Sequence, residues 1–313
     1  MAEESRTAVY AAFAGNVAIA VSKFIAFGFT RSTAMLTEAI HSLVDTGNQG
    51  LLLLGMRRAS RPPDPGHPFG HGLELYFWSF VVALMVFTVG GVVSIYEGVQ
   101  RIRAPEPIDR PWINFLVLGA AFLFEGASFA VALRQQRKQW PGVRLLPFLK
   151  RSKDPGLFAV LLEDAAALIG LVIAFVGVLL AVLTGRPEID GWASVAIGAL
   201  LMVVAAFMAN ETRSLITGEA ASPAVVAHIR ELLQADPRVT EVVEVLSLHL
   251  GPQEILLGVT LDFRDDLPGG DIETAAQELS DAIQAAEPRI TRVFLRPGTA
   301  VRPGEAVQFA EAM

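Results

Sequence analysis

The chain of 313 residues contains no cysteine. This absence excludes a disulfide framework, a thiolate metal site, an iron–sulfur cluster and a cysteine nucleophile. Charged residues are scarce, at 18% of the sequence, whereas typical soluble domains have about 25%. The net charge of -7 provides no basic surface for nucleic acid, so we expect no nucleic-acid partner.

Apolar residues dominate instead, at 52% of the chain with a mean hydropathy of +0.47. A helix needs about 20 mostly apolar residues to cross a bilayer. Glu3 and Glu4 stand before the first apolar stretch in place of a basic cluster, so we interpret that stretch as a helix and not as a signal peptide. Six stretches of sufficient length predict a multi-pass membrane protein: Val9–Thr30, Ala34–Met56, Leu75–Gln100, Trp112–Leu133, Leu157–Thr184 and Gly191–Asn210.

Lysine and arginine in the connections predict the orientation in the bilayer. They gather between the second and third stretches and above all between the fourth and fifth, from Arg134 to Lys153. Both termini are therefore predicted to be cytoplasmic. The preference for arginine over lysine indicates a GC-rich bacterial genome, and so a bacterial inner membrane.

After Asn210 the composition changes and predicts a small α/β domain. A helix between Pro223 and Pro237 precedes two strands, a second helix and a last strand, which lie over Val239–Leu250, Glu254–Arg264, Asp271–Ala286 and Ile290–Leu295. This αββαβ order is typical of a ferredoxin-like layer. We expect a transmembrane domain of six helices at 1–212, a cytoplasmic α/β domain at 213–297 and a disordered tail at 298–313.

Ionisable side chains within the predicted spans are candidate functional groups, because each costs about 2.5–3.5 kcal/mol near a helix centre on insertion scales. The second span carries His41 and Asp45, which are four residues apart and so share a helix face. The fifth span carries Glu163 and Asp164 at a similar depth. Neutral imidazole and carboxylates suit a divalent cation such as zinc. Alternatively, these groups pair with one another and hold the helices together.

The connection between the second and third spans reads DPGHPFGHG and contains Asp64, His67 and His71. Three ligands in so short a loop predict a second metal site, and Gly66 and Gly70 permit tight turns between them. The alternative is a pair of loop histidines that cap helices.

Together these motifs resemble the cation diffusion facilitator family. The resemblance rests on EAIHSLVD in the second span, HPFGHGLE before the third, the six spans and the C-terminal α/β domain, while VLLEDAAALIG is similar to the animal zinc transporter 9 subgroup. It implies a homodimeric secondary transporter, and not an enzyme, that exports Zn2+ from the cytoplasm in exchange for protons. Mn2+, Fe2+ and Co2+ are alternative substrates, and no organic cofactor is implied.

The resemblance places a transport site on His41, Asp45 and Asp164, and it places the loop site on Asp64, His67 and His71. The family's remaining ligand in the fifth span falls on Val160, which cannot bind metal. We expect that either water or a neighbouring carboxylate completes the site, with Glu163 ahead of Glu38 and Glu125.

Two further family features are missing from this sequence. Many members join the dimer through a Lys–Asp pair, whose places are taken here by Leu73 and, approximately, Thr217. Relatives often bind zinc in the C-terminal domain, but here it offers only His228 and His249. We therefore expect this domain to dimerise without metal.

Two other functions fit buried carboxylates and histidines. One is an intramembrane metallohydrolase, in which a metal activates water, although the His-Glu-x-x-His pair usual in metalloproteases is absent. The other is a metal-sensing or purely structural membrane protein. Transport coupled to protons has a physical basis, because binding metal requires neutral histidine and ionised carboxylates and so releases protons.

Overall fold

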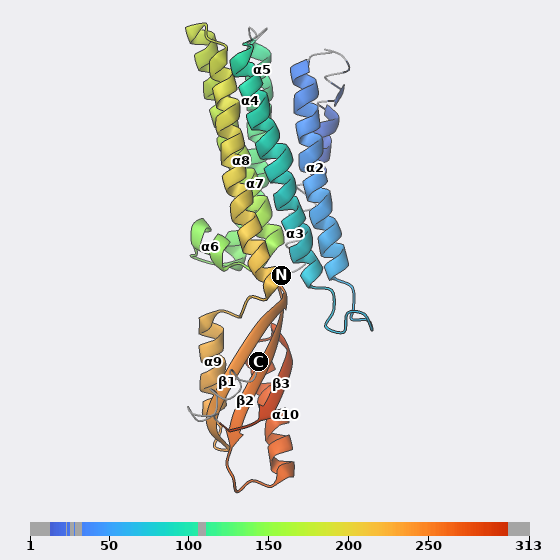
Figure 1. Cartoon of the computed structure of the whole chain (residues 1–313), viewed down its shortest axis with the longest axis vertical. Helices are drawn as coiled ribbons and strands as arrows, with labels where there is room; N and C mark the ends of the chain where they lie inside the picture. The colour runs from blue at the N-terminus through green and yellow to red at the C-terminus, as the bar shows by residue number, and fades with distance from the viewer. Residues whose placement is uncertain (1–12, 23, 26–27, 29–32, 106–110, 300–313) are drawn as a thin grey trace, which may run out of the picture. The chain divides into compact units, whose positions relative to one another are not determined.

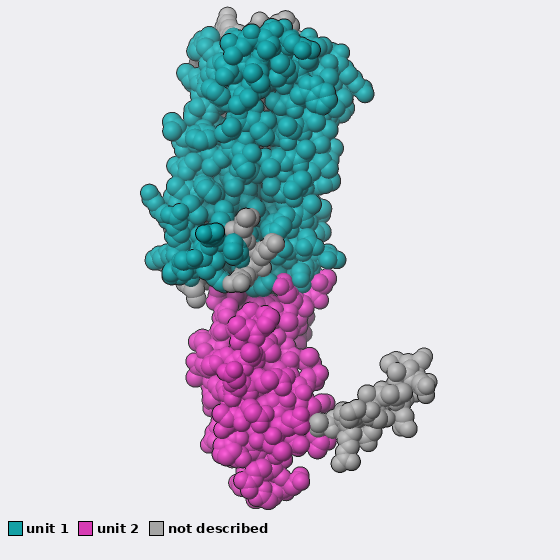
Figure 2. Space-filling model, turned by 90° about the vertical axis from the view of Figure 1, so that its left-hand side faces the viewer, with its two compact units in different colours: residues 1–62, 73–216 teal, residues 63–72, 217–313 magenta. Residues whose placement is uncertain are grey.

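The computed structural model in Figure 1 describes residues 13–22, 24–25, 28, 33–105 and 111–299. Its contacts divide the chain into two compact units, coloured separately in Figure 2. The helical unit comprises Met1–Pro62 and Leu73–Ile216, and the C-terminal unit comprises Pro63–Gly72 and Thr217–Met313. Much of the predicted first span and nearly all of the predicted disordered tail lie outside the described residues.

The helical unit is built from long helices that lie side by side (Figure 1). They are α2 (Thr33–Ala59), a continuous rod of α3 (Leu73–Met85), the π-helix η1 (Val86–Val92) and α4 (Val93–Arg103), then α5 (Pro111–Gln139), the short α6 (Leu145–Arg151), α7 (Pro155–Thr184) and α8 (Glu188–Thr217).

Four helices of the described chain are long and apolar enough to cross a membrane: Leu73–Arg103, Asn114–Gln139, Pro155–Thr184 and Glu188–Thr217. The chain is therefore a multi-pass membrane protein, as its sequence predicts. The apolar helix Phe13–Ser22 is shorter, and the count of six spans stays a prediction.

Helix α7 begins at a residue that satisfies its first backbone N–H groups. The Asp154 side chain accepts hydrogen bonds from the N–H groups of Gly156 and Leu157, at 3.0 and 3.4 Å. Pro155 follows at the first helical position, where its missing N–H costs nothing. This start defines where α7 begins, and Glu163 and Asp164 follow in its third turn.

The continuous rod of η1 and α4 crosses α8 backbone to backbone through glycines spaced seven residues apart, which are Gly91 and Gly98 on the rod and Gly191 and Gly198 on α8. A Cβ atom on Gly98 would lie 2.7 Å from the carbonyl oxygen of Gly191, and one on Gly198 would lie 2.7 Å from that of Gly91. Only glycine permits so close an approach. Near this crossing, Arg101 of α4 forms an ion pair with Asp190 of α8.

A hydrophobic core fills one half of the helical unit. This half contains the last turn of α2 and the first turn of α3, and we call it the core end. Its fully buried members include Leu52, Phe158, Leu161 and Met208, each at most 1% exposed.

The C-terminal unit is a three-stranded mixed sheet with two helices. Its elements follow in the predicted order: α9 (Pro223–Gln234), β1 (Val239–Gly251), β2 (Glu254–Phe263), α10 (Gly269–Ala286) and β3 (Ile290–Pro297). The strand order is β1-β2-β3, with β1 antiparallel and β3 parallel to β2. Its core joins Ile229 and Leu233 of α9 and Ile283 of α10 to the sheet.

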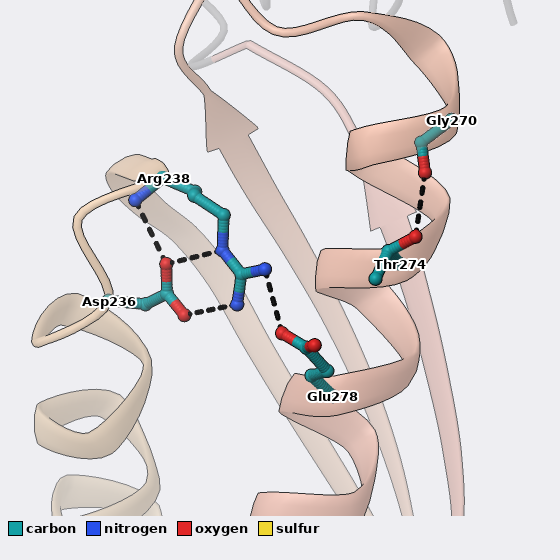
Figure 3. Close-up of polar contacts among 5 residues, drawn as sticks. All are labelled: Asp236, Arg238, Gly270, Thr274 and Glu278. Carbon is teal, nitrogen blue, oxygen red and sulfur yellow. Dashed lines mark hydrogen bonds and ion pairs between the residues drawn. The ribbon is translucent and has the colours of Figure 1, made fainter.

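One arginine ties the turn before β1 to α10 (Figure 3). The Arg238 guanidinium donates to both Asp236 oxygens, at 2.9 and 2.7 Å, and to Glu278 Oε2 at 2.7 Å. In α10 itself, the Thr274 hydroxyl donates to the Gly270 carbonyl at 2.9 Å. The hydrogen bonds from Arg238 lower the pKa of Asp236, so this carboxylate is ionised and the pair is charged at neutral pH.

Candidate metal centre

A cavity of about 350 Å³ lies within the helical unit. Its lining extends from Gln49 and Glu163 to the Arg101–Asp190 ion pair. Leu52 and Leu161, the next buried residues toward the core end on α2 and α7, are 1% and 0% exposed and belong to the hydrophobic core. The carboxylates that line this cavity are Asp45, Glu97, Glu125, Glu163, Asp164 and Asp190.

The two adjacent acids of α7 have different partners. Asp164 is 5% exposed, and its Oδ2 accepts a hydrogen bond of 2.7 Å from the hydroxyl of Ser128 on α5. Glu163 Oε2 accepts one of 3.3 Å from Nε2 of Gln49 on α2. Neighbouring residues of a helix point about 100° apart, and both directions here meet the same cavity.

Asp45 brings a third carboxylate to this cavity from α2. Asp45, Asp164 and Glu125 are all close enough to Glu163 to repel its charge. Bringing several anionic groups together in a bilayer is costly without a cation. These carboxylates could therefore hold a divalent cation as cargo.

The remaining sequence candidates for this site divide into two groups. His41 and Glu38 belong to α2, but their side chains lie outside the described part of the chain. Val160 is 1% exposed and faces a second cavity of about 200 Å³, which Ser128 and Glu125 also line. Of the carboxylates considered as replacements for the Val160 ligand, Glu163 and Glu125 both line the main cavity.

The loop triad is more compact. Within the described residues, Asp64, His67 and His71 form the one group of three acids or histidines whose ligand atoms all lie within 4.8 Å of one another. Asp45, Glu163 and Asp164 face one cavity without meeting that spacing. The ligand atoms of the loop triad are therefore already close enough to bind one ion. Asp45, Glu163 and Asp164 would have to move closer to one another to do so.

Hydrogen bonds fix Asp64 at the centre of the triad. Its Oδ1 accepts from the backbone N–H groups of Gly66 and His67, both at 2.8 Å. Its Oδ2 lies 3.0 Å from His71 Nε2, and the two imidazole ring centres are 4.2 Å apart. The hydrogen bond from His71, followed by that from the His67 backbone, lowers the pKa of Asp64 to about 2. The triad thus offers an ionised oxygen and two imidazoles, a ligand set suited to zinc.

The triad loop packs against the C-terminal unit, to which its contacts assign it. Arg292 of β3 donates to the Pro68 carbonyl at 3.3 Å, and its guanidinium lies 5.3 Å from the centre of the Phe69 ring. A Cβ atom on Gly72 would lie 2.2 Å from the Leu250 carbonyl oxygen at the end of β1. The sequence motif gives no signal of these contacts, because they join residues more than 170 positions apart.

The two histidines of the C-terminal unit lie in different surroundings. His249 on β1 is 2% exposed, and its backbone N–H donates to the Glu219 carbonyl at 3.0 Å. His228 on α9 is exposed and lies near enough to Glu287 to lower the pKa of that carboxyl, after the larger effect of Arg289. The prediction that this unit binds no metal stays a prediction.

Two amides in the cavity wall were not among the candidates from sequence. Asn48 and Gln49 on α2 are 4% and 2% exposed and line the cavity. Uncharged amides in an apolar helix are a weaker sequence signal than carboxylates. The spacing of four residues from Asp45 to Gln49 places both on one helix face and could have identified Gln49.

Apolar helices around a carboxylate-lined cavity, followed by a small α/β unit, define a multi-pass membrane protein whose cavity has the ligand chemistry for a cation. Comparison with known families supports this class, because residues 9–217 match the model described as the cation efflux transmembrane domain. The chain belongs to the cation efflux family.

Several curated relatives are transporters by name. The mouse proton-coupled zinc antiporter SLC30A9, mitochondrial, is 33% identical over 267 residues, which cover 83% of this chain and 47% of the relative. Metal tolerance protein C4 of Arabidopsis thaliana is 30% identical over 85% of this chain and 58% of its own length. The cation-efflux pump FieF of Escherichia fergusonii is 22% identical over 97% of this chain and 96% of its own length.

These matches bear on three of the sequence predictions. The predicted family and its zinc transporter 9-like subgroup are confirmed. The metallohydrolase alternative is not favoured, since two of these relatives are named as an antiporter and an efflux pump. The bacterial inner membrane finds no support, because the mouse relative is named as mitochondrial. The chain spans about half the length of the SLC30A9 relative.

Proposed function

We propose that the chain is a secondary transporter that exports Zn2+, or a similar divalent cation, from the cytoplasm in exchange for protons. The observation that carries this proposal is the meeting of Asp45, Glu163 and Asp164 on one cavity between apolar helices. Membership of the cation efflux family and the relative named as a proton-coupled zinc antiporter support it.

The ligands would act by replacing the hydration shell of the ion. Asp45 and Asp164 supply anionic oxygens from two helices, and His41 supplies an imidazole nitrogen from the turn before Asp45. Glu163 takes the place of the ligand missing at Val160. Each of these groups must lose its proton to bind zinc, so ion binding releases protons and protonation expels the ion.

The proposed topology has six spans with both termini in the cytoplasm and a ferredoxin-like C-terminal domain. The basic residues Arg57 and Arg58 end α2 at the core end, which supports a cytoplasmic position for that end. The cavity then faces away from the cytoplasm. The loop triad becomes a cytoplasmic metal site that modulates transport.

The test is zinc entry into vesicles that contain the purified protein, followed by a zinc-sensitive dye. Asp45→Asn and Asp164→Asn should each abolish flux while the protein stays folded, because the amide removes the anionic oxygen. Glu188→Gln is the matched control, since this acid lies at the start of α8 and pairs with Arg186. Flux at the wild-type rate in folded Asp164→Asn would show that the ion does not pass this site.

A further inference from the structure

Three buried side-chain oxygens have no hydrogen bond from any described residue: Asn48 Oδ1, Gln49 Oε1 and Glu163 Oε1. All three residues line the main cavity. Buried polar atoms are almost always paired, because an unpaired one loses its hydrogen bonds to water and gains nothing in return. Three such oxygens on residues that line one cavity therefore indicate that an electron-pair acceptor, such as a cation, binds there.

Gln49 and Glu163 also contact each other across two helices. Gln49 Nε2 on α2 donates to Glu163 Oε2 on α7 at 3.3 Å. One end of the amide and one oxygen of the carboxylate are thus engaged, while the other oxygen of each residue has no partner within the described chain. A purely structural pair would be expected to satisfy both ends of a fully buried amide.

The position of this pair places it at the proposed ion path. Gln49 lies one helical turn from Asp45 on the same face of α2, and Glu163 precedes Asp164. Leu52 and Leu161 of the hydrophobic core follow toward the core end, at 1% and 0% exposed. The pair therefore lies at the core end of the cavity, which we call its floor, and Glu163 is itself one of the carboxylates proposed to bind the cation.

We propose that Gln49 is a positioning and specificity-determining residue of the cation site. Its amide nitrogen orients the Glu163 carboxylate, and its amide oxygen, together with that of Asn48, contributes neutral oxygen donors for the ion. This inference rests on the proposed transport function and names the residue that sets which cation is preferred.

The chemistry of the floor predicts the class of cation. Amide and carboxylate oxygens are ligands preferred by harder divalent ions such as Mn2+, whereas imidazole favours zinc. A site with one histidine and an oxygen-rich floor should accept Mn2+ beside Zn2+. Replacing Gln49 by histidine should then shift the preference toward zinc.

Three substitutions separate the roles of Gln49. Gln49→Leu removes both the amide N–H donor and the amide oxygen while keeping a side chain of similar size. It should raise the KM for Zn2+ and for Mn2+ by about tenfold or more, with a smaller change in kcat. The reason is that a metal ligand binds less tightly when the residue that orients it is lost. Gln49→His should raise the ratio of Zn2+ to Mn2+ transport. Gln49→Asn keeps the amide but shortens its reach to Glu163, so its KM should fall between those of the wild type and Gln49→Leu.

Gln136→Leu is the matched control. Gln136 on α5 is also a buried glutamine, 1% exposed, but its Nε2 donates to the Val143 carbonyl at 3.0 Å and it does not line the main cavity. This variant should change thermal stability without changing either KM or the ratio between the metals. It shows what loss of a buried amide does by itself.

The experiment measures Zn2+ and Mn2+ flux in vesicles and binding of each metal to the detergent-purified protein by calorimetry. Wild-type KM, affinity and metal ratio in both Gln49→Leu and Gln49→His would overturn the inference. If Gln49→Leu does not fold, Gln49→Asn and Gln49→His carry the test. A wild-type protein that transports neither metal would refute the proposed function, while binding that still depends on Gln49 would support the inference independently.

Discussion

The crossing of α4 and α8 makes a sharp prediction for Gly98→Ala. The added Cβ would lie 2.7 Å from the Gly191 carbonyl oxygen and 2.8 Å from the Val195 backbone nitrogen. Both are backbone atoms within a helix, so neither can rotate away. Overpacking of this kind costs about 1–3 kcal/mol, while alanine recovers about 0.5–1 kcal/mol of helix propensity.

The expected net destabilisation is about 1–2 kcal/mol, or roughly 5–30-fold in the folded-to-unfolded ratio. For a unit of this size the corresponding fall in Tm is about 2–8 °C. The assay heats the purified protein in detergent and measures the fraction that remains monodisperse on size-exclusion chromatography. Separation of the helices should also weaken the Arg101–Asp190 ion pair at the mouth of the cavity.

Gly119→Ala on α5 is the matched control, because a Cβ atom there meets nothing within 4 Å. It should leave the Tm unchanged or raise it. A Gly98→Ala protein as stable as Gly119→Ala would refute the reasoning that glycine is required by the close approach of α4 and α8.

Three further predictions concern the C-terminal unit and its loop. Replacing both His67 and His71 by alanine should weaken zinc transport in vesicles without abolishing it, and complete loss in a folded protein would make the loop part of the obligatory path. Arg238→Met should lower the Tm at neutral pH. Because Arg238 lowers the pKa of Asp236 below its usual 3.8, the difference in Tm between Arg238→Met and the wild type should be present above pH 3.8 and should shrink as pH falls through the lowered pKa. A difference in Tm that does not depend on pH would contradict this prediction. Leu246 and Phe294 are 59% and 57% exposed, and both pair with Gly258 across neighbouring strands on one face of the sheet. We predict that this face forms a homodimer without metal. The double substitution Leu246→Asp with Phe294→Asp should then give a monomer in analytical ultracentrifugation.

Local sequence patterns predicted much of this architecture. The apolar stretches from Leu75 onward correspond to helices, and the αββαβ order of the C-terminal unit follows from alternation and turn residues. Carboxylates in apolar helices identified Asp45, Glu163 and Asp164, which line one cavity. These features depend on period and composition, which a single segment contains.

Contacts between distant segments were beyond these patterns. The packing of the triad loop against Arg292 and Leu250 depends on tertiary structure that no local motif encodes. The pairing of Gln49 with Glu163 joins two helices whose mutual rotation is set by packing. The π-helix Val86–Val92 likewise leaves no distinct period in so short a run of apolar residues.

The central claim is that zinc crosses the membrane at the carboxylates of this cavity in exchange for protons. The most direct measurement follows zinc and lumenal pH together in sealed vesicles of the reconstituted protein, with dyes for each. We predict that zinc entry raises the lumenal pH, that an acidic lumen accelerates zinc entry, and that Asp164→Asn abolishes both signals. Zinc flux that is indifferent to the pH gradient, or that persists in folded Asp164→Asn, would contradict the account.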